Sequence, residues 1–156
     1  MSLGRVAVLL GVVALAPSAC GSGHHITFSR YARVGGLSVP TPAGFHRRAW
    51  HEGVAISDGT IGTGSPSAPL TAGYPPRNPK HVVLTVFRGD FHDPVPGEQL
   101  PLTLHDLGRA SGGLTLWGGA FLIRGQSYGI ELWLGRNASP ADRSTVLGAL
   151  RAIQLR

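Results

Sequence analysis

The stretch that most restricts the fold is residues 114–155, which is typical of a β-hairpin followed by a capped helix. Along Tyr128–Leu134, every second residue is a large apolar one. This period of two indicates a strand with one buried face, and it puts Trp133 on the face opposite Tyr128. We expect the turn of the hairpin near residues 124–127.

The helix signal begins at Ser139, a residue type whose side chain accepts a hydrogen bond from the unpaired amides at a helix start. Pro140 suits the first helical position, and Asp142 brings a carboxylate to the positive end of the helix dipole. The next apolar residues recur at helical spacing and leave one stripe to pack on a sheet: Val146, Leu147, Leu150 and Ile153. We therefore predict a helix over residues 139–153.

Short apolar runs bounded by proline and glycine predict further strands upstream. Residues 82–87 are apolar on both alternating faces except at Thr85, which indicates a strand in the middle of the sheet. Residues 40–44, Pro-Thr-Pro-Ala-Gly, are typical of a turn. The leucines between residues 100 and 107 fit either a strand edge or a loose helical turn. The other predicted strands are residues 26–29, 45–50, 54–56, 114–117 and 121–123, of which 45–50 and 54–56 form a hairpin.

The segment from Gly62 to Pro79 is rich in proline and glycine, so neither a helix nor a central strand can form across it. A loop of this length in a compact domain is either functional or disordered, and the sequence leaves both alternatives open. The candidate binding surface is this loop together with the aromatic residues Tyr74, Trp117 and Trp133. Because tryptophan is more often part of a core, a structural role for both tryptophans also remains open.

Short strands, proline-glycine turns and one strong C-terminal helix predict an α+β domain, an antiparallel sheet with the C-terminal helix packed on it. Residues 26–156 are enough for a single globular domain of this kind. The chain resembles the PsbP-like sandwich of small exported bacterial lipoproteins in the segment Val39–Phe45, the strand Tyr128–Leu134 and the helix Ser139–Ile153. This resemblance implies a non-catalytic binding or accessory role.

Residues 1–19 have the layout of an export signal peptide, with a short polar start, an apolar run and a small-residue end. The apolar run from Val6 to Ala16 covers about 16 Å as a helix, too little to span a bilayer. The single cysteine, Cys20, resembles the lipobox cysteine of bacterial lipoproteins. The resemblance implies cleavage before Cys20, its acylation, and residues 20–25 as a lipidated cysteine and tether. Ordinary signal cleavage with an incidental cysteine is the alternative.

The formal net charge of +6 makes the chain basic. Thirteen of its fourteen cationic residues are arginines scattered along the sequence, with only Arg47 and Arg48 adjacent. Nucleic-acid binding normally requires a clustered basic stripe, so we predict no nucleic-acid partner. A basic face lying on an anionic membrane fits an exported protein better.

Seven histidines raise the question of a metal site. Asp90 and His92 would point the same way from an extended chain, and Asp93 could orient the imidazole. This spacing matches no strong metal motif, so a metal-binding lipoprotein that uses loop histidines and aspartates is the alternative function.

We predict no cofactor and no enzymatic activity. No serine stands in a Gly-x-Ser-x-Gly turn, and His105 and Asp106, as neighbours on a strand, would point to opposite faces. The leading expectation is an extracytoplasmic lipoprotein held on the cell membrane by its lipid anchor. Its domain would bind a protein or cell-envelope partner whose identity the sequence does not give.

Overall fold

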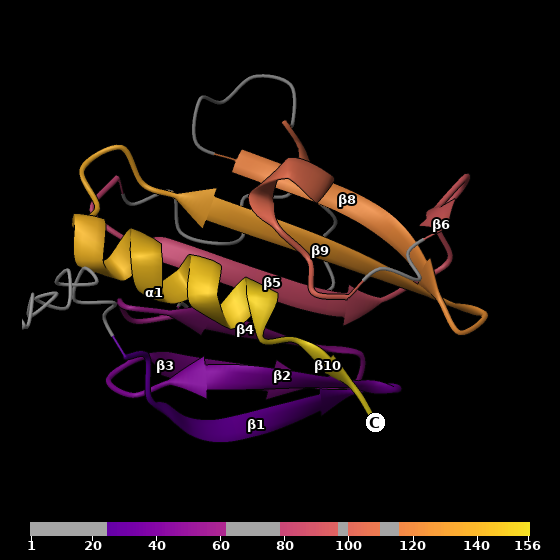
Figure 1. Ribbon diagram of the computed structural model, residues 1–156, viewed down its shortest axis with the longest axis horizontal. Helices are drawn as coiled ribbons and strands as arrows, with labels where there is room; N and C mark the ends of the chain where they lie inside the picture. Colours follow the sequence, from indigo (N-terminus) through magenta and orange to yellow (C-terminus); the bar gives the residue numbers. More distant parts are fainter. Residues whose placement is uncertain (1–24, 62–78, 97–99, 110–115) are drawn as a thin grey trace, which may run out of the picture.

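The computed structural model describes residues 25–61, 79–96, 100–109 and 116–156, and these form two sheets and one α-helix (Figure 1). The small sheet has the order β1-β2-β10, with β1 (Phe28–Val34), β2 (Leu37–Pro42) and β10 (Gln154–Leu155). The large sheet has the order β3-β4-β5-β9-β8-β6, and β7 also pairs with β8. Its strands are β3 (His46–Trp50), β4 (Gly53–Ser57), β5 (Val82–Arg88), β6 (Val95–Pro96), β7 (Gly108–Arg109), β8 (Leu116–Ile123) and β9 (Gln126–Leu134).

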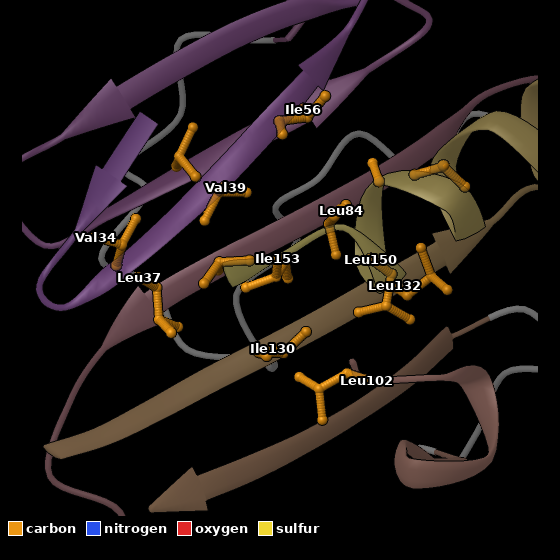
Figure 2. Packing of buried hydrophobic residues seen from close by; sticks show 14 of the residues in the cluster. Val34, Leu37, Val39, Ile56, Leu84, Leu102, Ile130, Leu132, Leu150 and Ile153 are labelled. Carbon is orange, nitrogen blue, oxygen red and sulfur yellow. The ribbon is translucent and has the colours of Figure 1, made fainter. Parts of the chain in front are cut away.

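The helix α1 (Pro140–Arg151) and the small sheet lie side by side on one face of the large sheet (Figure 1). Their apolar side chains meet in one buried cluster (Figure 2). The small sheet contributes Val34, Leu37 and Val39, the large sheet contributes Ile56, Leu84, Ile130 and Leu132, and Leu150 and Ile153 come from the helix and the residues after it. The predicted class is therefore confirmed: a mainly antiparallel α+β domain with the C-terminal helix packed on the sheet.

The centre of the large sheet is β5, which pairs antiparallel with β4 on one side and with β9 on the other. Val82, Leu84 and Val86 are fully buried on the face that the helix and the small sheet cover. This confirms the prediction that residues 82–87 form a central strand. The predicted hairpins over residues 45–56 and before Leu134 are also confirmed, the second turning at Arg124 and Gly125.

The helix begins where the sequence predicts. The hydroxyl of Ser139 accepts a hydrogen bond from the amide of Asp142 at 3.0 Å, and Pro140 occupies the first helical position. Arg143 ties the first turn to the end of β9, because its guanidinium donates to the carbonyl of Gly135 at 2.6 Å. Val146 and Leu150 are fully buried against the sheet, as the helical stripe predicts, whereas Leu147 is half-buried. The helix ends at Arg151, so Ile153 is buried in the core just after it and not within it.

Tyr128 joins the two sheets at one end of the molecule. Its hydroxyl, on a side chain only 1 % exposed, accepts a hydrogen bond from the amide of Gly36 at 3.0 Å. The same hydroxyl donates to Gln126 at 2.7 Å. Gly35 has φ +55, and a side chain there would collide with Gln126 and Tyr128, so the β1–β2 turn requires glycine.

The predicted turn over residues 40–44 is wrong in its first half, because β2 continues through Pro42. Beyond Ser38, β2 pairs with β1 but no longer with β10. Amides on the unpaired side need no ladder partner, so prolines are tolerated there. The first strand also lies later than predicted, at Phe28–Val34.

Other differences come from the C-terminal half. The expectation of one buried face on β9 is wrong, since Glu131 on the opposite face is only 7 % exposed. The predicted runs 114–117 and 121–123 meet in one strand, β8, which begins at Leu116 and continues through Gly118 and Gly119. Residues 114 and 115 lie outside the described residues. Between residues 100 and 107 the chain forms a short 3₁₀ helix, Leu104–Asp106. Of the two predicted alternatives, a strand edge or a helical turn, the structure therefore has the helical turn. The strand β10 was not predicted.

In the described parts of the chain, no helix is long and apolar enough to cross a membrane.

We expect Ser139→Ala to lower the free energy of unfolding by about 1 kcal/mol, because the amide of Asp142 loses its acceptor at the helix start. Chemical denaturation measures the change. Ser144→Ala, an exposed position inside the same helix, is the matched control and should cause no loss. Equal midpoints for wild type and Ser139→Ala would contradict the capping role.

Candidate binding site

The structure does not bring the predicted aromatic residues together. Trp117 pairs with Leu132 and packs against the core, whereas Trp133 pairs with Leu116 and lies on the opposite face of the large sheet. Both side chains are partly exposed. Tyr74 and the segment from residue 62 to 78 lie outside the described residues, as do Cys20 and the leader.

The residues proposed for a metal do not assemble into a site. Asp90, His92 and Asp93 follow β5, and His92 is exposed. Within the described ranges, no three histidine, cysteine, aspartate or glutamate side chains gather closely enough to hold a metal ion. The metal-binding alternative therefore gains no support from these three residues.

Asp106 has a structural role in the short 3₁₀ helix. Its carboxylate accepts hydrogen bonds from the hydroxyl of Thr103 at 2.7 Å and from the amide of Thr103 at 2.6 Å. These bonds stabilise the charged form, so the pKa of Asp106 lies below its usual value, the hydroxyl of Thr103 being the main cause. The leucines on either side of this turn, Leu102 and Leu107, are buried in the core.

The face of the large sheet opposite the core contains a buried carboxyl group. Cross-strand pairing surrounds Glu131 with Thr85 on β5 and Gly118 on β8, while Gly129 and Trp133 flank it along β9. Gly118 and Gly129 have no side chain, and Thr85 offers only a hydroxyl group. The sheet therefore holds the Glu131 side chain above a floor of small residues.

Aromatic rings lie next to this carboxyl group on the same face. Phe87 and Phe91 pack edge to face, with ring centroids 5.6 Å apart. Both rings cover Gly129, where an added Cβ would come within 3 Å of them. In the same cross-strand row, the Trp50 ring covers Gly53. A row of aromatic side chains thus runs beside Glu131.

Among the described residues no hydrogen bond or ion pair of Glu131 is found. The side-chain atoms that are completely buried and unpaired there are Thr41 Oγ1 and Arg143 Nε, not the Glu131 oxygens, and Glu131 keeps 7 % of its surface exposed. Burial without a partner disfavours the charged form, and it raises the pKa of Glu131 from 4.5 to about 7. Buried polar groups are normally paired, so an unpaired one calls for an explanation. The protonated group can donate a hydrogen bond, and the ionised group can hold a cation strongly in this poorly hydrated position.

Asp58, the residue after β4, contacts the residues at the start of β5. One carboxylate oxygen accepts a hydrogen bond from the amide of Val82 at 2.7 Å, and the other lies 3.1 Å from Nδ1 of His81. Ser57, 2 % exposed, uses its hydroxyl as the acceptor for the amide of Gly59. The two contacts of Asp58 hold the end of β4 beside the start of β5.

A second feature is an open polar depression of about 370 Å³ at the end of β5. Its lining includes Glu52, Arg88 and Asp90, together with the turn between β8 and β9. Glu131 does not line it. Because charges of both signs share this open and hydrated rim, we rank it below the buried carboxyl as a binding site.

Sequence reasoning missed Glu131 because the alternation of β9 indicated a solvent-facing position. One usable signal was the composition of the neighbouring strands. Thr85 is the single polar residue of the apolar run 82–87, and Gly118 interrupts β8. The cross-strand register that aligns both with Glu131 appears only in the folded sheet.

No protein-family model matches this chain, and a search of curated proteins finds no significant match. The resemblance to PsbP-like lipoproteins therefore stays a prediction.

The raised pKa of Glu131 predicts a specific pH dependence. Between about pH 4.5 and pH 7 the unfolded chain loses the proton while the folded state keeps it, so stability falls as the pH rises through this window. Glu131→Gln removes this loss, which amounts to about 3 kcal/mol at pH values above 7. Urea denaturation of both proteins across the window measures the difference.

Glu52→Gln is the matched control, because it makes the same charge change at an exposed turn. It should leave the pH profile of the wild type almost unchanged. Parallel pH profiles for wild type and Glu131→Gln would show that the Glu131 carboxyl is not desolvated.

Proposed function

We propose that this chain is a lipid-anchored extracytoplasmic domain that binds a protein or cell-envelope partner and does not catalyse a reaction. The leader and Cys20 support the anchoring part of the proposal. The binding part is supported by one observation above the others. Glu131 is 93 % buried, lacks a partner among the described residues, and lies beside aromatic rings on the face of the large sheet opposite the core.

The chemistry of this face favours a partner with a cationic group. An ionised carboxylate in a poorly hydrated position gains much from a charged amine or guanidinium, because such hydrogen bonds are about twice as strong as neutral ones. Phe87, Phe91 and Trp50 provide rings whose faces attract cations. We therefore place the partner contact of this domain at Glu131 and propose that the partner presents a lysine, arginine or amino group there.

Crosslinking in the native cell envelope tests the binding site. Wild-type protein and Glu131→Gln are crosslinked and purified in parallel, and the partner is quantified by mass spectrometry. Loss of a charge-assisted hydrogen bond should reduce recovery of the specific partner by at least about tenfold. Asp93→Asn, which neutralises an exposed carboxylate that does not line the depression at the end of β5, should recover it as well as wild type does. Equal recovery with Glu131→Gln would remove Glu131 from the binding site.

The anchor is tested separately. Intact mass spectrometry of the native product should give a chain that begins at Cys20 and carries the mass of a diacylglyceryl group. Two acyl chains hold a protein on a membrane far more firmly than one, so the product should stay with membranes in high salt. Cys20→Ala should leave an uncleaved precursor or release some soluble protein. A mature chain with an unmodified thiol that salt washes off would contradict lipidation.

A further inference from the structure

The two N-terminal edge strands of the domain carry a group of arginines. β1 is the edge of the small sheet and β3 is the edge of the large sheet. The guanidinium of Arg47 on β3 donates to the carbonyl of Tyr31 on β1 at 3.1 Å, which joins the two edges. Arg30 and Arg33 on β1 are exposed, as is Arg47. Because side chains alternate along a strand, Arg30 and Arg33 leave β1 on opposite faces and share its edge. We name this region, formed by β1 and β3, the basic edge.

No acidic side chain compensates these charges on the strands themselves, because neither β1 nor β3 contains aspartate or glutamate. Among the described residues, Arg30, Arg33 and Arg47 form no ion pair. The hydrogen bond of Arg47 goes to a neutral carbonyl, so its charge is not neutralised. The basic edge is therefore a local positive surface and not a set of salt bridges.

Aromatic side chains accompany the arginines. Tyr31 is 44 % exposed, and its ring lies 6.4 Å from the ring of Phe28 at an angle of 56°. Tyrosine has an apolar ring and a polar hydroxyl, and it is enriched where a protein meets the headgroup region of a membrane. Arginines beside an exposed tyrosine match the chemistry of an anionic lipid surface.

The position of the basic edge in the chain also matters, and this step rests on the proposed lipidation of Cys20. Phe28, the first residue of β1, follows Cys20 by eight positions. A chain segment of that length spans at most roughly 28 Å when fully extended. A lipid on Cys20 would therefore keep the basic edge close to the membrane surface.

We propose that the basic edge docks on an anionic bilayer and so orients the domain on the membrane. Each arginine near an anionic surface should raise binding about fivefold. Charges on edge strands also discourage edge-to-edge pairing of sheets, and the two roles are compatible. Of these two roles, only membrane docking predicts that the domain binds vesicles in proportion to their anionic lipid.

The test uses the chain from residue 21 onward, which lacks Cys20 and its lipid. Every described core residue lies after residue 27, so this chain keeps the whole core cluster. Co-sedimentation compares vesicles of phosphatidylcholine with vesicles that also contain phosphatidylglycerol. Wild type should bind the anionic vesicles and not the neutral ones, and high salt should abolish the binding.

The variants distinguish membrane binding by the basic edge from membrane binding by the net positive charge of the whole domain. Arg30→Gln, Arg33→Gln and Arg47→Gln together should weaken binding about a hundredfold. The matched control changes three exposed arginines outside the two strands, Arg124, Arg136 and Arg151, to glutamine and should keep binding within a few-fold.

Because Arg47→Gln also loses the bond to Tyr31, Arg30→Gln with Arg33→Gln is measured as well and should lower binding about twentyfold. Thermal unfolding checks that each variant is folded. Equal losses in the edge and control variants, or no preference of wild type for anionic vesicles, would overturn the proposal. A concentration-dependent dimer that the edge substitutions abolish without changing vesicle binding would overturn it too. Since no lipid on Cys20 is involved, these outcomes are independent of the mass-spectrometric test of the anchor.

Discussion

The structure depends on one apolar face of the large sheet, the face of β5 and β9 that must be removed from water. The helix α1 and the small sheet cover most of it, and Leu102 and Leu107 beside the 3₁₀ helix add to the cover, so no single layer is sufficient by itself. Leu84 and Ile130 on the sheet and Leu150 on the helix are completely buried in this shared contact. Removing any one of these side chains would leave a cavity in the shared cluster.

This arrangement also explains the character of the opposite face. The large aliphatic residues of β5 and β9 are used for the core, and the alternate positions that remain include Thr85, Gly129 and Glu131. A carboxyl group there is costly for folding, and such costs are often retained where a protein binds a partner. In our proposals this face and the basic edge have different tasks, since one receives the partner and the other sets the distance to the membrane.

The sequence predicts the helix, the central strand and the two hairpins, because each depends on local signals such as Ser139 or the period of residues 128–134. It does not predict β10, because two residues carry no pattern and their pairing with β2 depends on the helix delivering them. It also places β2 poorly, since Pro40 and Pro42 are strand residues only beside an unpaired edge. Glu131 was missed for a related reason: its burial follows from the register of three strands, which alternation along one strand cannot give.

The closure of the small sheet has a consequence for how the chain becomes folded. β2, near the front of the domain, pairs with β10 at its very end, and the amide of Arg156 donates to the carbonyl of Gly36 at 3.0 Å. Contacts between such distant parts of a sequence form late and slow the acquisition of structure. A chain that is threaded through a secretion channel must stay unfolded until it has crossed. This topology delays completion of the domain until its last strand is available, which is compatible with the export that we propose.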